Sequence, residues 1–499
     1  MHLMVVPAGS LIVAAASVAP WLHERTRHVI SLIGGLMSAI LGVVLAWPVL
    51  IGGPTLMTPG KFLVLDQLGA GMLVLVMTVY AASTVASWCY IRRERAQRII
   101  TERQTKLYYA LLHLFVFTMV AGLLANNIAV LWIALEATTL STTLLVAFRR
   151  TTGAVEAAWK YIMLCSTGIT LGLLGVLMMS FAAQTSGAVH GGEAFLLTAL
   201  REHAALFAPA TVRWAFVFLF IGIGTKVGLA PMHTWLPDAH SKTPSPISAL
   251  LSGVLLNVAF LVLLRFKFVA DAALGSPDWT NQLFLVFGVL SIAIPALILL
   301  SQRNYKRMLG YSSVEHMGIM TFAVGLGPFG MVPALMHMAG HALAKPLLFL
   351  GAGEFLDIWK STLVTDVRDA MTRVPRTATL FLLGLLALLA VPPSALFVSE
   401  VVLVGYGMTV HPAITLLVLG LLTITCIAMV RMVIPMCYAK ERASGDAVAP
   451  SQRSVERWNA VHLVLALQCV GVVVLGCWFM SGQGFAFMTA MADAIMARV

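Results

Sequence analysis

One apolar stretch decides the architecture of this chain: residues 215–232 read AFVFLFIGIGTKVGLAPM, with Lys226 inside it and no acidic residue beside it. The stretch is long enough to cross a bilayer, which takes about 20 apolar residues. An ionisable side chain at membrane depth is costly unless it faces a partner, a water-filled cavity or an ion path. Lys226 therefore points to charge movement through a membrane.

The composition of the 499 residues places nearly all of the chain in a membrane. Hydrophobic residues make up 60%, charged residues 11%, and the mean hydropathy is +0.92. A soluble domain of this length could not bury so much apolar surface. We therefore predict an all-α polytopic membrane protein with about 14 transmembrane helices and no strands. The predicted spans are residues 4–22, 29–52, 68–91, 107–124, 126–147, 159–182, 213–236, 245–269, 281–302, 311–329, 331–357, 376–410, 412–438 and 460–482.

Basic residues are distributed unevenly among the predicted loops. Most of the 32 Lys and Arg residues fall in the odd-numbered connections between spans. The even-numbered connections and the termini hold only Lys61, Arg201, Arg213 and Arg498. Because cytoplasmic loops carry the excess of Lys and Arg, both termini are predicted on the non-cytoplasmic side of a bacterial or archaeal inner membrane. The net charge of +11 thus indicates topology and not nucleic-acid binding.

No cofactor is predicted in this chain. The six cysteines lie in or beside spans and form no CxxC pair, which argues against a disulfide framework or an iron–sulfur cluster. No glycine-rich phosphate loop or dinucleotide fingerprint follows a strand. We therefore expect that the chain itself performs no redox chemistry.

Glu136 is the only charged residue of the segment LWIALEATTL in the fifth predicted span. An unpaired carboxylate at this depth would be protonated or very costly, so a basic partner on another helix is expected, and Lys226 is the candidate. Such a pair can hold or release a proton as its separation changes. A static structural ion pair is the alternative interpretation.

His337, His341 and Lys345 recur at intervals of four in MHMAGHALAKPLLFL, residues 336–350. This spacing predicts one helical stripe with members roughly 6 Å apart along the axis. A ladder of titratable groups at that spacing can relay protons, with water between its members. A lone membrane histidine is otherwise often a satisfied interhelical hydrogen bond. No cysteine or carboxylate ligand set accompanies the stripe, so no metal site is predicted.

Helix-breaking residues surround two of the intramembrane charges. Glycines at 222, 224 and 228 and a proline at 231 weaken the seventh span around Lys226, and the proline pair 392–393 interrupts the twelfth span before Glu400. Broken helices are tolerated at depth only where they line a cavity or the protein interior. An offset of five spans reverses the direction of the helix, as an inverted-topology repeat requires. The alternative for Glu400 is a position near a helix end.

Two further histidines are candidates for the same function. His233 follows Lys226 closely and either delivers protons to it or belongs to a rigid interfacial turn that includes residues 235–240. His316 adjoins Glu315 in the segment GYSSVEHMGI of the tenth span and is a second candidate for a central path. Glu315 also fits the offset of five spans from Glu136.

Five motifs together resemble the antiporter-like subunit family of complex I, Mrp-type cation/proton antiporters and energy-converting hydrogenases. They are ANNIAVLWIALEATTLSTTLLV, EAAWKYIMLCSTG, GTKVGLAPMHTWLPDAHSKTPSPISALLSGVLLN, YSSVEHMGI and HALAKPLLFLGAG. The resemblance extends from about the third to the thirteenth span, and the segments EATTL and SGVLLN are similar to component F of hydrogenase-4. It implies fourteen spans with two inverted five-helix repeats and broken helices 7 and 12.

The resemblance also implies roles for individual residues. The implied roles are a first half-channel pair in Glu136 and Lys226, a central polar axis in His337, His341 and Lys345, and a second half-channel residue in Glu400. Asn257, in SGVLLNVAF, stands where several relatives carry a lysine that links the first pair to the central axis. In this chain the link would pass through Asn257, water or His316.

The same resemblance divides the chain into four parts. They are residues 1–106 with helices 1–3, residues 107–270 with the first inverted repeat (helices 4–8), residues 281–438 with the second inverted repeat (helices 9–13), and residues 439–499 with a cytoplasmic loop and helix 14.

We therefore predict a proton-translocating, antiporter-like membrane subunit of a redox-driven complex of the hydrogenase-4 or formate hydrogenlyase type. The expected partners are other membrane subunits and a peripheral redox arm with nickel–iron hydrogenase-like and iron–sulfur subunits. Two alternatives remain: a secondary Na⁺/H⁺ antiporter subunit of the Mrp type, and the membrane partner of an inorganic-carbon uptake complex. A purely structural anchor would gain nothing from the intramembrane charges.

Overall fold

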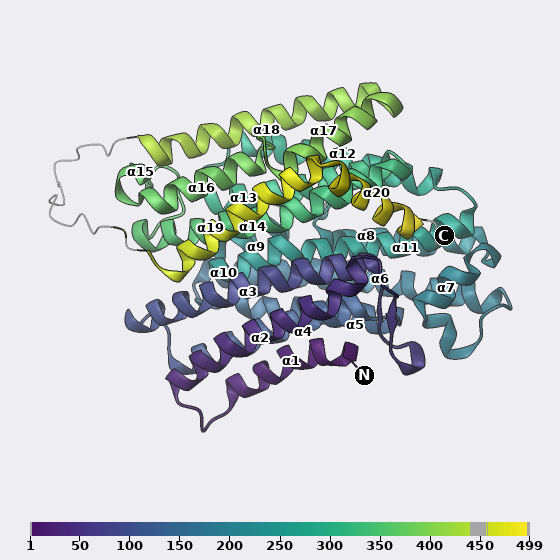
Figure 1. The fold of residues 1–499 in the computed structure, drawn as a ribbon, viewed down its shortest axis with the longest axis horizontal. Coiled ribbons are helices and arrows are strands. Elements are labelled where there is room, and N and C mark those ends of the chain that lie inside the picture. The colour runs from purple at the N-terminus through teal and green to yellow at the C-terminus, as the bar shows by residue number, and fades with distance from the viewer. Residues whose placement is uncertain (1, 440–455, 457, 497–499) are drawn as a thin grey trace.

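A computed structural model describes residues 2–439, 456 and 458–496 as a bundle of helices (Figure 1). The long helices run along one common direction, and the first helix starts at the same end of the bundle at which the last helix finishes. Among the described residues, ten helices are long and apolar enough to cross a membrane, and three shorter apolar helices accompany them. The predicted class of helical membrane protein is confirmed.

The described elements follow one another without any large non-helical region. The first half contains α1 (His2–Val18), α2 (Glu24–Leu50), β1 (Leu56–Met57), η1 (Pro59–Lys61), β2 (Val64–Leu65), α3 (Gln67–Ala96), α4 (Glu102–Leu124), α5 (Ile128–Val146), α6 (Thr152–Thr185), η2 (Gly191–Phe195), α7 (Leu197–His203), η3 (Ala204–Leu206), α8 (Pro209–Val227), α9 (Trp235–Lys242), α10 (Ser245–Leu250), the π-helical turn η4 (Leu251–Leu255) and α11 (Leu256–Leu274). The second half contains α12 (Asp278–Leu299), α13 (Tyr305–Gly325), η5 (Pro328–Gly330), α14 (Met331–Trp359), α15 (Ala370–Arg373), α16 (Pro375–Leu388), α17 (Ala395–Val410), α18 (Pro412–Tyr438), α19 (Ala460–Met480) and α20 (Gly482–Met496).

The antiparallel pair β1–β2 and helix α20 depart from the sequence prediction. The predicted absence of strands is wrong for the antiparallel pair β1–β2, whose turn contains Gly60 at a φ of +79° that glycine adopts without steric cost. The helix α20 was not anticipated after the last predicted span. The cytoplasmic loop predicted after residue 439 lies mostly outside the described residues.

The two predicted helix breaks are present. Helix α8 ends at Val227, one residue after Lys226, and Gly228 caps it at a φ of +83°. The second break separates α16 from α17, where Ser394 caps α17 by accepting a hydrogen bond from the Phe397 amide at 3.2 Å. Both intramembrane charges therefore lie within a turn or two of an interrupted helix.

Gly222 does not weaken α8, contrary to the sequence interpretation. The helix is continuous from Pro209 to Val227, and a Cβ at Gly222 would lie 2.5 Å from the backbone nitrogen of Gly172 in α6. Glycine at this position allows the two helix backbones to approach closely, as small residues do in membrane helix packing. The break is produced by the residues after Val227 alone.

Residues 235–240 belong to a buried helix and not to the predicted interfacial turn. Trp235 and His240 both have an exposed fraction of 0%, and α9 spans Trp235–Lys242. The Trp235 indole donates a hydrogen bond to the Thr225 carbonyl at 2.9 Å, which satisfies a carbonyl near the end of α8. The segment after the first break is thus packed against the helix that carries Lys226.

The most shielded helices occupy the middle of the bundle. The segment Ser245–Leu274 is buried throughout its apolar window, and α14 packs against α3, α10, α13, α16, α17 and α19. In Figure 1, α19 crosses in front of α14 although the two are distant in sequence. Polar side chains on α11, α13 and α14 are therefore separated from the surrounding lipid by other helices.

One end of the bundle is held together by directly paired charges. The Arg93 guanidinium on α3 donates to Glu354 at 2.8 Å and to Asp357 at 2.9 Å, both on α14. Glu456 accepts hydrogen bonds from the Thr377 hydroxyl at 2.6 Å and from the Arg376 amide at 2.7 Å, and it contacts His462 at 2.9 Å.

Glu456 therefore joins the beginnings of α16 and α19. Burial opposes its ionisation, but hydrogen bonds from Thr377, His462 and the Arg376 and Thr377 amides outweigh that effect and lower the pKa of the Glu456 carboxyl below its usual value.

Candidate functional site

Lys226 lies in the last turn of α8 with an exposed fraction of 0%. Its ammonium group donates hydrogen bonds to the Thr139 hydroxyl at 2.8 Å and to the Tyr161 hydroxyl at 2.9 Å. The ammonium nitrogen also lies 5.2 Å from the centroid of the Tyr161 ring, within cation–π range. Neutral hydroxyl groups thus replace water around this cation.

Glu136 lies close to this lysine but is not in direct contact with it. The carboxylate accepts a hydrogen bond from the Ser166 hydroxyl at 2.6 Å, and its buried Oε2 atom has no hydrogen-bond partner in the described part of the chain. No ion pair of the described residues joins Glu136 to Lys226, so the expected direct pair is not formed. Thr139 follows Glu136 by one helical turn on α5 and places its hydroxyl on the ammonium group instead.

Lys345 has a closely similar environment on α14. Its buried ammonium group donates to the Leu309 carbonyl at 3.1 Å and to the Ser312 hydroxyl. Glu315 follows Ser312 on α13 by three residues, has an exposed fraction of 2%, and leaves its Oε1 atom without a partner. Each buried lysine is therefore held by a hydroxyl group one turn away from a carboxylate on the same helix.

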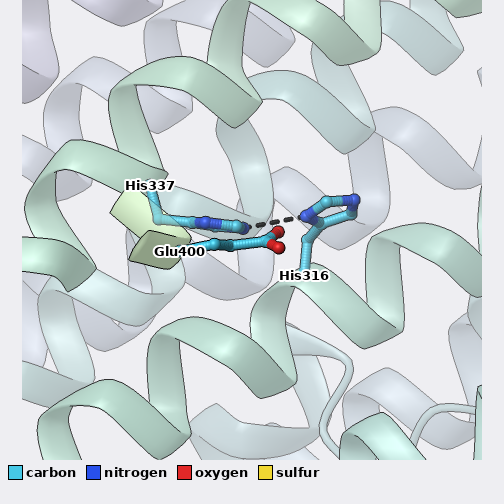
Figure 2. Close-up of side chains that lie close together, drawn as sticks. All are labelled: His316, His337 and Glu400. Atoms are coloured by element: carbon cyan, nitrogen blue, oxygen red, sulfur yellow. Dashed lines mark hydrogen bonds between the residues drawn. The ribbon is translucent and has the colours of Figure 1, made fainter. Parts of the chain in front are cut away.

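His316 and His337 form the centre of the site. Their Nδ1 and Nε2 atoms lie 2.8 Å apart, and His337 Nδ1 lies 2.9 Å from the Ser399 hydroxyl. Figure 2 shows that the Glu400 side chain runs beside His337 and directs its carboxylate toward the space between the two rings. His341, one turn after His337, has its ring centroid 5.5 Å from that of His316.

The fold therefore brings together residues that are separated by up to 84 positions. One ligand atom from each of His316, His337 and Glu400 lies within 4.8 Å of the other two. The sequence predicts no carboxylate beside the histidine stripe, and that prediction is wrong because α17 places Glu400 against α13 and α14. No spacing along the chain indicates this contact.

Asn257 lies at the edge of the histidine stripe. Its amide nitrogen donates to the Gly253 carbonyl at 2.9 Å and to the Met338 carbonyl at 3.3 Å, while its Oδ1 atom has no partner. Gly253 belongs to the π-helical turn η4, a type of irregularity that is frequent at functional sites. Asn257 therefore contacts the residue that follows His337.

His233 lies in the segment between α8 and α9. Among the described residues, no hydrogen bond joins it to Lys226. Its ring centroid is 6.3 Å from that of Tyr311, and its Nδ1 atom is buried without a partner. His240 is stacked on Phe349 at 4.8 Å, and neither of its ring nitrogens has a hydrogen-bond partner. Buried polar groups of this kind usually bind water or serve a function.

Several members of the site were not identified from the sequence. They are the hydroxyl residues Thr139, Tyr161, Ser312 and Ser399, and the carboxylate Glu315 as a functional group. Four of these five lie in the quoted segments EATTL, EAAWKY and YSSVEH, so a search for hydroxyl groups one turn from a charge would have found some of them. Ser399 was detectable only as the neighbour of Glu400.

The arrangement is suited to moving protons. A lysine held by neutral hydroxyl groups can exchange its proton without separating a contact ion pair, whose separation in an apolar interior would be costly. Imidazole nitrogens in hydrogen-bond contact can pass a proton because each ring offers one donor and one acceptor nitrogen. In contrast, Arg93 and its two carboxylate partners at the end of the bundle are directly paired.

Known proteins share this sequence pattern and this fold. Residues 125–427 match the family described as "NADH:quinone oxidoreductase/Mrp antiporter, TM". The hydrogenase-4 component F homolog of Methylacidiphilum infernorum is 35% identical over 368 residues, which cover 73% of this chain and 77% of that protein.

Two solved structures share the fold over almost the whole chain. A chain of the membrane-bound sulfane sulfur reductase, an archaeal respiratory membrane complex, superposes with a TM-score of 0.81 at 20% identity and covers 99% of this chain and 96% of its own length. A chain of the Mrp complex of Dietzia sp. gives a TM-score of 0.81 at 17% identity and covers 99% of this chain and 97% of its own length. This chain is an antiporter-like membrane subunit and belongs to the NADH:quinone oxidoreductase/Mrp antiporter family.

Proposed function

We propose that this subunit translocates protons through Glu136, Lys226, the histidine stripe and Glu400, driven by redox chemistry in partner proteins. One observation carries the proposal: Lys226 and Lys345 are both fully buried and both are held by hydroxyl groups instead of a carboxylate. A structural ion pair would place the opposite charges in contact, as Arg93 and Glu354 do at 2.8 Å. An ammonium group without that contact can change its charge during a transport cycle.

The proposed path has two polar sections and a link between them. The first section contains Glu136 and Lys226, and the second contains Lys345, His341, His337, His316 and Glu400. His233 and Asn257 belong to the link, where each has a buried polar atom that is free to bind water. An amide cannot titrate near neutral pH, so Asn257 would hold a water molecule in place and not carry the proton itself.

We further propose that fourteen segments cross the membrane. The fourth to eighth of these segments form one repeat, and the ninth to thirteenth form a second repeat of inverted topology. The two interrupted segments support this, because α8–α9 and α16–α17 each break beside a buried titratable residue. With the arginine-rich and lysine-rich loops inside, both termini lie on the non-cytoplasmic side. Lys226 and Glu400 would then serve opposite faces of the membrane.

The proposed partners are other membrane subunits and a peripheral redox arm with nickel–iron hydrogenase-like and iron–sulfur proteins. The similarity to the hydrogenase-4 component F homolog supports this assignment. All six cysteines of this chain are free and scattered, so the chain offers no cluster-binding set for the redox step itself. Electron transfer would therefore act on the buried charges from outside the subunit.

The test is proton translocation by the intact complex in sealed membrane vesicles, with electron transfer measured in parallel. Lys226→Ala is expected to abolish proton translocation, whereas the control Lys160→Ala is expected to retain it because Lys160 is an exposed residue paired with Glu156 at 2.7 Å. Proton translocation at the parental rate by the Lys226→Ala complex would contradict the proposal. Repeating the measurement without Na⁺ separates proton pumping from Na⁺/H⁺ exchange, since only the exchange requires Na⁺.

A further inference from the structure

The pair of central histidines and Glu400 have the composition of a metal site. His316, His337 and Glu400 come from three different helices, α13, α14 and α17, and each directs one potential ligand atom into the same space (Figure 2). These three atoms lie within 4.8 Å of one another. Two imidazole nitrogens and one carboxylate oxygen are a known ligand set of zinc sites that keep a fourth position for another ligand.

The hydrogen bonds around His337 prepare its ring for a metal ion. The Ser399 hydroxyl donates its only hydrogen to the Leu396 carbonyl at 2.8 Å, so at 2.9 Å it accepts a hydrogen bond from His337 Nδ1. The Nδ1 atom of His337 therefore carries the proton, and the lone pair of Nε2 points toward His316. Metal-binding histidines characteristically donate their other ring N–H to a fixed acceptor in this way.

The separations of the ligand atoms are compatible with a zinc ion. Zinc ligands lie about 2.0–2.2 Å from the metal, which places them about 3.3 Å apart in a tetrahedral site. The two histidine nitrogens are 2.8 Å apart and must separate slightly, and the carboxylate oxygen lies within 4.8 Å of the histidine ligand atoms. Without a metal, the Nδ1 atom of His316 carries a proton and donates a hydrogen bond to His337 Nε2. When the metal binds, the Nε2 atom of His316 carries this proton instead, so the charge of both rings is unchanged.

A further buried histidine and a second carboxylate lie near the three ligand residues. His341 is fully buried, and its ring centroid is 5.5 Å from that of His316. Among the residues that the structure describes, neither of its ring nitrogens has a hydrogen-bond partner. Glu315 adjoins His316 and lies near enough to Glu400 for the two carboxylates to interact electrostatically. Two carboxylates offset the charge of a divalent cation in an apolar interior, where an uncompensated ion would be very costly.

We propose that His316, His337 and Glu400 form a binding site for Zn²⁺ or a similar divalent transition-metal ion, with a fourth position open to another ligand. Two nitrogen ligands and a carboxylate favour zinc and cobalt over Mg²⁺ and Ca²⁺, which prefer oxygen ligands. A bound ion occupies the lone pairs of both central rings and therefore blocks proton transfer between them. This blocking effect rests on the proposed function, whereas metal binding does not.

Cobalt serves as the probe because four-coordinate Co²⁺ absorbs visible light and Zn²⁺ does not. We expect the purified intact complex in lipid nanodiscs to bind one Co²⁺ per copy of this chain, with visible absorption bands that added Zn²⁺ removes. His337→Gln and Glu400→Gln should each weaken Co²⁺ binding at least tenfold. The control is His113→Gln, a buried histidine of α4 that contacts Tyr80 at 2.6 Å and Ser31 at 2.7 Å and should leave the bands unchanged.

Size-exclusion chromatography of each variant complex confirms that the subunit is folded and assembled before the titration. Absence of the Co²⁺ bands from the parental complex, or equal Co²⁺ affinity in the His337→Gln complex, would overturn the metal site. Zinc inhibition of proton translocation is measured on the same preparations. Co²⁺ and Zn²⁺ binding without any loss of proton translocation would leave the metal site standing and contradict the assignment of the two histidines to the proton path.

Discussion

The hydroxyl group of Tyr161 offers a sharp test of how Lys226 is stabilised. Tyr161→Phe keeps the aromatic ring and its 5.2 Å contact with the ammonium nitrogen but removes the hydrogen bond of 2.9 Å. Thr142, the other partner of the phenol, still donates to the Thr138 carbonyl at 2.6 Å, so no second polar group is left without a partner. The substitution therefore affects mainly the charged form of Lys226.

The size of the effect follows from the strength of that hydrogen bond. A hydrogen bond to a charged group contributes about 1.5–3 kcal/mol, and about 1.4 kcal/mol corresponds to a tenfold change in an equilibrium. If the transport cycle passes through the ammonium form of Lys226, Tyr161→Phe should slow proton translocation roughly tenfold to a hundredfold. The remaining Thr139 hydroxyl, at 2.8 Å, should prevent a complete loss.

The assay is redox-driven acidification of inverted membrane vesicles that contain the intact complex, normalised to the amount of assembled complex. The matched control is Tyr305→Phe, because Tyr305 is also fully buried but its hydroxyl bonds only to backbone carbonyls, at 3.1 Å and 3.4 Å. Parental proton translocation in Tyr161→Phe, or an equal loss in Tyr305→Phe, would refute the assigned role of the hydroxyl group.

Three further predictions concern stability, measured as thermal unfolding in detergent. Gly222→Ala should destabilise the protein by about 1–3 kcal/mol because the new Cβ meets the backbone of α6, whereas Gly420→Ala, with open space around it, should be neutral or slightly stabilising. Arg93→Met should lower the free energy of unfolding by about 1–3 kcal/mol. If the contact between Arg93 and Glu354 is the cause, the same substitution should have a smaller effect in a protein that already carries Glu354→Gln. Folding lowers the pKa of Glu456, so its ionised carboxylate stabilises the folded protein. This stabilisation is complete above the pKa of the unfolded state, about 4.3, and is lost as the pH falls through the folded pKa. The Glu456→Gln variant should therefore lose stability at pH 6, and it should approach the parental protein as the pH is lowered toward 3.

Most of the helices were predictable because lipid imposes a simple rule on the sequence. A segment that crosses a bilayer must be apolar and about 20 residues long, and it must satisfy its own backbone hydrogen bonds. The predicted span 412–438 coincides with α18, and the predicted break at residues 392–393 separates α16 from α17. The hairpin β1–β2 escaped prediction because two short strands outside the apolar segments leave no periodic pattern.

The members of the site were easier to predict than their contacts. A charged residue within an apolar segment is rare, because burying its charge at membrane depth costs free energy. Lys226, Lys345 and Glu136 were therefore identified from the sequence alone. The partners of the two lysines proved to be hydroxyl groups, because Thr139 and Ser312, each one turn from a carboxylate on the same helix, accept their hydrogen bonds. Serine and threonine cost little in a membrane helix, so nothing in the composition marks them.

The contact between Glu400 and the two central histidines shows why such a site must be read in three dimensions. Each residue alone has a structural explanation. A membrane histidine commonly forms a hydrogen bond with a neighbouring helix, and a carboxylate commonly lies near a helix end. Only the packing of α13, α14 and α17 brings the three ligand atoms within 4.8 Å. The same proximity on which the proposed proton transfer between His316 and His337 depends creates the donor set that a transition-metal ion requires. A proton path built from imidazole and carboxylate groups at this spacing therefore carries sensitivity to zinc as a direct chemical consequence.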